Sequence, residues 1–158
     1  MLTDLRIGHG YDLHRLQPGG RLVLGGVVVA TDMSPIAHSD GDVVLHALAD
    51  ALLGALGKGD IGEHFPNDDS AYRNAASRTF IDAIKSLMAL DGWRAANVDI
   101  TILAERPKLK AFKPQMVAFI RDLLDCPVNV KAGTNEGVDA IGRGEAIAAH
   151  AVVLLSRQ

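Results

Sequence analysis

The stretch Gly41-Asp42-Val43-Val44-Leu45-His46-Ala47-Leu48-Ala49-Asp50-Ala51-Leu52-Leu53-Gly54-Ala55-Leu56 contains the clearest helical pattern of the chain. Its apolar and small side chains recur at intervals of three and four residues, which is the spacing of one helix face. We expect Ser39 or Asp40 to cap this helix, and Gly57 and Gly59 to end it. His46 lies inside the pattern, on a rigid element that can present a ligand.

Strand and helix patterns alternate along the rest of the chain. The strand at 147–155 is apolar on both faces, which indicates a position in the middle of a layered fold. The alternation predicts an α/β fold, an α+β sandwich in which a mixed sheet carries helices packed on one side. The other expected elements are strands at 5–12, 98–102 and 128–132, a pair of strands within 22–30 broken by Gly25-Gly26, and helices at about 72–90 and after Pro114.

Composition and charge exclude several classes of protein. The 158 residues fit one domain, which we place at 1–158, and the formal net charge of −3 argues against a general nucleic-acid binder. Cys126 is the single cysteine, so no intrachain disulfide can form and a reducing compartment is the simpler interpretation. We find no signal peptide, and no stretch approaches the roughly 18 apolar residues of a membrane span. We therefore expect a cytoplasmic protein that binds neither nucleic acid nor membrane.

Asp12 and His14 are one residue apart in the first expected strand, where alternate side chains point to the same face. With His46 they form two imidazoles and a carboxylate, a set that suits zinc and leaves one coordination position open for substrate or water. The alternative is that the three residues are unrelated, because a lone histidine is more often a core or surface residue than a ligand. His9, His64 and His150 lack such partners, and we interpret His150 as a packed structural histidine.

Three further segments could bind anions or sugars. His38 and Ser39 precede the first helix, where free N–H groups attract phosphate, although Ser39 could simply cap the helix. The loop 59–69 has glycines, carboxylates and an exposed Phe65 that could bind a polyol or a ribose, or it could be a solvated loop. Residues 104–110 and 131–136 leave strand ends, where a phosphate with a bridging cation could bind, although such basic residues are often merely solvated.

The order and spacing of these segments resemble those of the 2-C-methyl-D-erythritol 2,4-cyclodiphosphate synthase family, which acts in non-mevalonate isoprenoid (terpenoid) biosynthesis. The resemblance covers essentially the whole chain. It rests on 6–14, 37–42 and 46–48, on Asp60-Ile61-Gly62, Phe65-Pro66 and Pro107-Lys108, and on Gly142-Arg143-Gly144-Glu145.

The resemblance implies a lyase that forms a homotrimer with active sites between neighbouring subunits. One Zn²⁺ per subunit would be held by Asp12, His14 and His46. In this family the 2-phosphate of 4-diphosphocytidyl-2-C-methyl-D-erythritol 2-phosphate attacks the β-phosphate. This releases CMP and closes 2-C-methyl-D-erythritol 2,4-cyclodiphosphate. Charge neutralisation and alignment should dominate such a step between two anions.

The resemblance also assigns roles to single residues. His38 and Thr134 match residues that stabilise the transition state, and Glu136 matches a ligand of a second divalent cation, Mg²⁺ or Mn²⁺. Arg143 and Glu145 match residues near a cavity on the threefold axis that can hold an isoprenoid diphosphate. The substrate-binding set implied is Asp12, His14, His38, Ser39, Asp60, Ile61, Gly62, Phe65, Pro66, Asn67, Asp68, Asp69, Ala104, Glu105, Arg106, Pro107, Lys108, Leu109, Lys110, Gly133, Thr134, Asn135, Glu136 and Arg143.

Three positions depart from the family pattern, and two other functions compete with the synthase. Gly133 and Asn135 replace hydroxyl residues beside Thr134, which removes side-chain hydroxyls but retains the backbone donors, and Ala140 replaces a phenylalanine that contacts substrate in the family. One alternative is a zinc phosphohydrolase, which would need a general base that we do not find near the three ligands. The other is a trimeric isoprenoid-diphosphate-binding protein with an idle metal site.

Overall fold

The computed structural model describes residues 4–157, so residues 1–3 and 158 of the expected domain lie outside the described part. A five-stranded sheet has the order β4-β1-β7-β5-β6, and a separate hairpin pairs β2 with β3. The strands are β1 (Leu5–Pro18), β2 (Leu22–Leu24), β3 (Val27–Ala30), β4 (Met33–Pro35), β5 (Trp93–Leu103), β6 (Val128–Gly133) and β7 (Ala146–Arg157).

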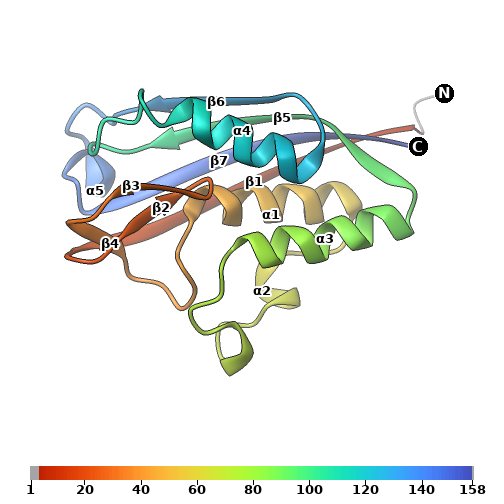
Figure 1. The fold of residues 1–158 in the computed structure, drawn as a ribbon, viewed down its shortest axis with the longest axis horizontal. Helices are drawn as coiled ribbons and strands as arrows, with labels where there is room; N and C mark the ends of the chain where they lie inside the picture. The colour runs from red at the N-terminus through yellow and green to blue at the C-terminus, as the bar shows by residue number, and fades with distance from the viewer. Residues whose placement is uncertain (1–3, 158) are drawn as a thin grey trace.

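Figure 1 shows the three long helices together on one side of this sheet. They are α1 (Val43–Leu56), α3 (Arg78–Leu90) and α4 (Lys113–Leu124). The short elements α2 (Ile61–His64), η2 (Ser70–Tyr72) and α5 (Asp139–Gly142) lie in the connections. The expected fold class is confirmed, because β7 pairs antiparallel with β1 and β5 whereas β5 and β6 are parallel, which makes the sheet mixed.

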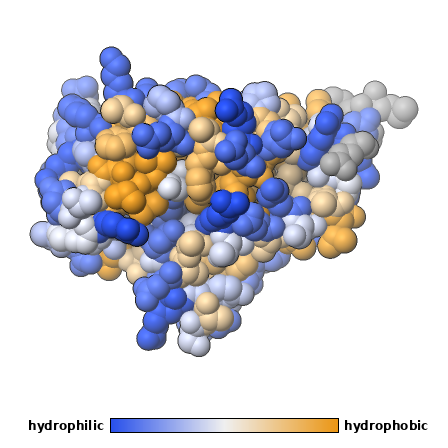
Figure 2. All heavy atoms as spheres, viewed as in Figure 1, coloured by the Kyte–Doolittle hydropathy of each residue, from blue (hydrophilic) through white to orange (hydrophobic). Residues whose placement is uncertain are grey.

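The expected central strand is β7, which lies between β1 and β5 and buries most of its residues. On the helix side, hydrophobic side chains are visible over the β2–β3 hairpin, where Val28 is exposed (Figure 2). None of the helices among the described residues has the length and apolar character needed to cross a membrane.

Two expected helix starts are wrong. The helix expected from about residue 72 begins at Arg78, because the Asp69 carboxylate accepts a hydrogen bond from the Ala71 N–H and forms the separate turn η2. The first helix is capped by Asp42 and not by Ser39 or Asp40.

Asp42 is fully buried and accepts hydrogen bonds from four backbone N–H groups. Two belong to Val44 and Leu45 in the first turn of α1, and two belong to Gly25 and Gly26 in the hairpin turn. Burial raises the pKa of Asp42 to about 6, although the N–H donors act to lower it. One carboxylate therefore caps α1 and ties the β2–β3 hairpin to it.

Helix α1 lies directly on the backbone of β1. Gly8 and Gly10 are on the strand face that meets the helix, and a β-carbon at Gly10 would overlap the carbonyl group of Ala47. A β-carbon at Gly8 would likewise overlap the carbonyl oxygen of Ala51. Because both obstructions are backbone atoms, they cannot turn aside as a flexible side chain would, and only glycine permits this close approach.

We expect Gly10→Ala to destabilise the protein by about 3 kcal/mol or more, because the helix must move away from the strand. The matched control is Gly54→Ala within α1, where the nearest atom to a new β-carbon is the His9 carbonyl oxygen at 4.0 Å. Removing a helical glycine there should stabilise the protein by about 0.5–1 kcal/mol. Urea unfolding measures both values, and similar midpoints for the two variants would contradict this account of the packing.

Candidate active site

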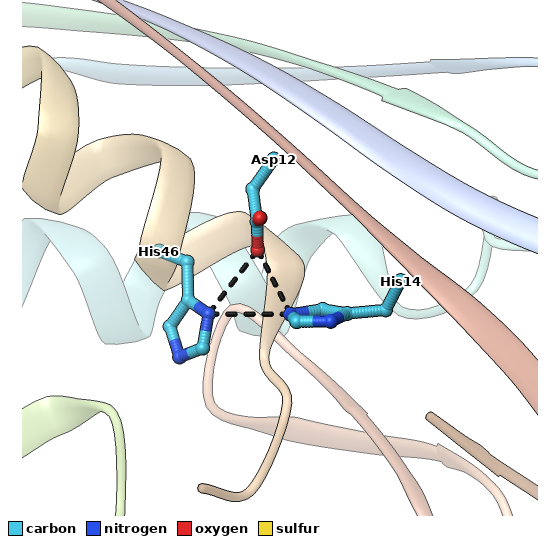
Figure 3. A group of neighbouring side chains, drawn as sticks. All are labelled: Asp12, His14 and His46. Atoms are coloured by element: carbon cyan, nitrogen blue, oxygen red, sulfur yellow. Dashed lines mark hydrogen bonds and ion pairs between the residues drawn. The ribbon is translucent and has the colours of Figure 1, made fainter. Parts of the chain in front are cut away.

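The structure brings Asp12, His14 and His46 together (Figure 3). Asp12 and His14 extend from the helix-facing side of β1, and His46 comes from the first turn of α1. Asp12 Oδ2 lies 2.9 Å from His14 Nε2 and 3.1 Å from His46 Nδ1, and the two imidazole nitrogens are 3.3 Å apart. The side chains keep 12–26% of their surface exposed, so the group is open to a ligand on one side.

The dimensions of this triangle fit a divalent metal ion. Bonds of about 2.0–2.1 Å directed to the corners of a tetrahedron place neighbouring ligand atoms about 3.3 Å apart. Within residues 4–157 no other group of three histidine, cysteine or acidic side chains converges in this way. Three protein ligands would leave the fourth position free for a substrate oxygen.

The three groups also perturb one another's proton affinity. Burial acts to raise the pKa of Asp12, but hydrogen bonds from His14 and His46 hold the pKa of that carboxyl well below its usual range. Burial acts to lower the pKa of His46, yet the hydrogen bond to Asp12 raises it above the usual value. The Asp12 carboxylate is therefore the main cause that raises the pKa of His46 within the triangle.

A cavity of about 460 Å³ adjoins the three ligands. His38 and Ser39 line it as expected, and the Nε2 atom of His38 lies 3.3 Å from the backbone oxygen of Asp69. Two of the helix N–H groups expected to attract an anion are not free, because Asp42 accepts from Val44 and Leu45 in the first turn. Ser39 does not cap the helix, and its Oγ lies 3.1 Å from His46 Nε2.

The loop expected to hold the sugar parts contributes only some of its residues to this cavity. Ile61, Gly62, Phe65 and Asn67 line it. The expected residues Asp60, Pro66, Asp68 and Asp69 do not, and the Asp60 side chain caps α2 instead.

The expectation of an exposed Phe65 is wrong, and its aromatic neighbours were missed. Phe65 is half-buried because its ring packs 4.6 Å from that of Phe80 and 5.4 Å from that of Tyr72. Tyr72, Phe80 and Ile36 form the apolar wall of the cavity. Periodicity assigned the first two to a helix, and it could not show that they face a ligand.

The strand ends form a second cavity of about 290 Å³, which shares no lining residue with the first. It is lined by Ala104, Glu105, Pro107, Lys108, Leu109, Lys110, Lys113, Ala132, Gly133 and Thr134. Arg106, Asn135 and Glu136 are absent from this lining, and Arg106 lies beside Arg15 and Glu145 in another hollow. The structure therefore does not bring the expected site residues together within one chain.

Three details bear on what this second cavity and its surroundings can bind. Glu105 Oε2 is the one buried side-chain oxygen or nitrogen without a hydrogen-bond partner among the described residues. Glu136 donates its backbone N–H to Thr134 Oγ1, which shapes the turn at the end of β6. Arg143 forms an exposed bidentate ion pair with Glu145 at 2.9 and 3.2 Å.

His150 belongs to no group of candidate metal ligands among the described residues, as expected, and it packs against two other rings. It is half-buried, its Nδ1 lies 3.1 Å from His9 Nε2, and its ring lies 4.8 Å from that of Tyr11. Alternation along the strand directs its side chain away from the helices, to the face that no helix covers.

Comparison with known proteins identifies the family. A family model described as the YgbB family matches residues 5–156. The chain belongs to the YgbB family. A 2-C-methyl-D-erythritol 2,4-cyclodiphosphate synthase from Pelobacter propionicus is 48% identical over 155 residues, which are 96% of this chain and 98% of the relative.

Solved structures agree with this assignment. The chain matches the bifunctional IspDF of Campylobacter jejuni with a TM-score of 0.94 and 39% identity, covering 98% of this chain but only 43% of that one. It also matches a Plasmodium falciparum IspF solved as a CDP complex, with a TM-score of 0.86, 32% identity, and coverage of 100% of this chain and 99% of that one. The expected family is confirmed, and with it the class of enzyme, a cyclodiphosphate synthase of isoprenoid biosynthesis.

We expect zinc affinity to fall as the pH falls through the raised pKa of His46, because the metal must displace the His46 proton. The loss should be about tenfold or more per pH unit, since Asp12 stays ionised in this range. Competition with a chromophoric chelator between about pH 5 and pH 8 measures it. The variant His64→Ala, which removes an imidazole outside the ligand set, should give the same slope, and a pH-independent affinity would contradict the assignment.

Proposed function

We propose that the chain converts 4-diphosphocytidyl-2-C-methyl-D-erythritol 2-phosphate to 2-C-methyl-D-erythritol 2,4-cyclodiphosphate and CMP. It does so as one domain, in the cytoplasm, with Zn²⁺ held by Asp12, His14 and His46. The observation that carries this proposal is the ligand triangle opening into a cavity that His38 and Ser39 also line. Family membership supplies the reaction.

Zinc suits the site better than magnesium does, because two of the three ligands are imidazole nitrogens and magnesium prefers oxygen. When bound, the ion supplies Lewis-acid polarisation of a phosphate oxygen and neutralises charge there. The residues around it orient the reactants. His38 and Ser39 can donate hydrogen bonds to phosphate oxygens, and the aromatic wall of Phe65, Tyr72 and Phe80 limits the access of water.

The reaction needs little proton transfer from the protein, because an ionised phosphate is its own nucleophile. One P–O bond forms between the 2-phosphate and the β-phosphorus, and the bond from the β-phosphorus to the oxygen of the CMP phosphate breaks. The chain must therefore align two anions and stabilise the charge between them. We assign transition-state stabilisation to His38 and to Thr134, and a second cation, Mg²⁺ or Mn²⁺, to Glu136.

We assign the cytidine and its phosphates to the second cavity. It is lined by the lysines at 108, 110 and 113, which can pair with phosphate. The unpartnered Glu105 Oε2 is an acceptor that suits an amino group such as that of cytosine. Because this cavity shares no residue with the zinc cavity, we propose that each complete site combines the two from neighbouring subunits of a homotrimer.

The uncovered sheet face supports such an assembly. Its β1 and β7 residues include five exposed large hydrophobic side chains: Leu5, Ile7, Tyr11, Leu13 and Val152. Several exposed apolar side chains on one face of a protein are typical of an interface. The threefold cavity for an isoprenoid diphosphate stays part of this proposal, with Arg143 already engaged by Glu145.

The hydrolase alternative is stronger in the structure than in the sequence, because His38 lies in the ligand cavity and could activate a water. In ¹⁸O-labelled water, we expect the parent protein to form the cyclic diphosphate without label. We expect Asp12→Asn to lose zinc and turnover together, and His38→Ala to keep zinc while turnover falls by about 100-fold or more.

Label in a phosphate product, or no cyclic product from the zinc-loaded protein, would contradict the synthase. If the parent shows no turnover and binds an isoprenoid diphosphate equally well with and without His38, the alternative of an isoprenoid-diphosphate-binding protein is favoured instead.

We expect Ile7→Glu to abolish both the trimer and the turnover while leaving zinc affinity unchanged, because all three ligands lie in one chain. Ile7 is 72% exposed on the open face of β1. The control is Leu90→Glu, at the end of α3, where the side chain is 83% exposed. Light scattering with a zinc titration measures both variants. An active Ile7→Glu monomer would contradict sites shared between subunits.

A further inference from the structure

The hydroxyl of Ser77 is used in an unusual way. Ser77 precedes α3 in the N-cap position, where a serine side chain normally accepts a hydrogen bond from the first turn. It forms no such bond here, and the residue is fully buried. Its Oγ lies 2.9 Å from His46 Nε2 and also bonds to Asp40 Oδ1. Ser77 therefore contacts Nε2 of the candidate metal ligand His46 instead of capping α3.

The direction of the protons in this chain of contacts follows from Asp40. Its Oδ1 accepts from the Asp42 N–H at 3.0 Å, and its Oδ2 accepts from the Ser77 N–H at 2.9 Å. The Asp40 carboxylate is therefore an acceptor, and the Ser77 hydroxyl must donate its single hydrogen to it. Ser77 Oγ can then only accept from His46, so Nε2 of the imidazole carries a hydrogen.

We propose that Ser77 and Asp40 are positioning residues that hold His46 with its hydrogen on Nε2 and its Nδ1 lone pair directed at the metal. The inference rests on the proposed zinc site, and it assigns to the site two residues that contact neither metal nor substrate. A carboxylate behind a ligating imidazole orients the ring and raises its basicity in many metal sites. Here the Ser77 hydroxyl lies between the Asp40 carboxylate and the His46 imidazole and transmits the effect of the carboxylate. We call these three residues the relay.

The same arrangement explains the position of Ser39. The hydrogen on His46 Nε2 also points toward Ser39 Oγ at 3.1 Å, and Ser39 Oγ accepts from the Gly41 N–H at 3.3 Å. Both contacts place donors on the Ser39 oxygen. The Ser39 hydroxyl hydrogen is therefore free to point into the cavity, where the proposed phosphate lies. The relay thus sets the roles of two hydroxyls. The Ser77 oxygen accepts the His46 hydrogen, and the Ser39 hydroxyl can donate into the cavity.

The test compares zinc affinities by chelator competition. Ser77→Ala should weaken zinc binding by about 10- to 100-fold, the usual effect of removing an outer partner of a metal ligand. Ser77→Thr keeps the hydroxyl and should restore most of the affinity. Asp40→Asn should also weaken binding, because an amide can donate to Ser77 and turn its hydroxyl hydrogen toward His46. Ser86→Ala, on the exposed side of α3, is the matched control and should change nothing.

Urea unfolding of each variant separates a lost relay from a lost fold. An Asp40→Asn or Ser77→Ala protein that folds and binds zinc within about twofold of the parent overturns the proposal. If neither variant folds, the proposal is tested by NMR on the zinc-loaded parent protein. Its ¹⁵N NMR spectrum should show a slowly exchanging His46 hydrogen on Nε2. Rapid exchange, or zinc on Nε2, overturns the relay. A parent that binds no zinc overturns the proposed function and the relay together, whereas affinity unaffected by the variants overturns the relay alone.

Discussion

The close approach of α1 to β1 is the constraint on which the rest of the structure depends. At Gly8 and Gly10 the helix backbone rests on the strand backbone with no side-chain layer between them. Because alternate strand residues share a face, Asp12 and His14 continue that same face beyond the glycines. His46 precedes Ala47, whose carbonyl meets Gly10, and so reaches these two side chains. Three ligand atoms can lie about 3 Å apart only because the two backbones are in contact.

The start of α1 is built from side chains that accept hydrogen bonds, and this decides how the site can bind anions. Asp42 accepts from the N–H groups of Val44 and Leu45 in the first turn, and Asp40 bonds to Ser77. These two N–H groups are therefore not free for a phosphate, and under the proposed function the site relies on the side chains of His38 and Ser39 and on the charge of the metal ion. A site of this kind depends more on side-chain orientation than one built on backbone N–H groups does.

Sequence periodicity predicted the elements that depend on local pattern. It failed for side chains whose position depends on a partner distant in sequence. It placed α1 and the central strand β7, and strand alternation alone brought Asp12 and His14 to one face. It offered Ser39 or Asp40 as the cap and missed Asp42, because Asp42 is held in place by the Gly25-Gly26 turn, which is distant in sequence. Phe65 was misjudged for the same reason, since its ring partner Phe80 belongs to another element of the fold. The substrate and the reaction came only from the resemblance to a family.

The division of the site between two cavities links assembly to catalysis. The three candidate metal ligands all come from two adjacent elements of one chain, so the proposed metal binding needs no partner. The cavity with Lys108 and Thr134 lies at the ends of β5 and β6 and shares no residue with the zinc cavity. Under the proposed function, a substrate with a cytidine at one end and a phosphorylated polyol at the other spans both cavities. If they meet only between subunits, a free monomer can bind zinc but lacks the groups that hold the leaving CMP. Cyclisation is then confined to the assembled protein, where water is best excluded from the activated diphosphate.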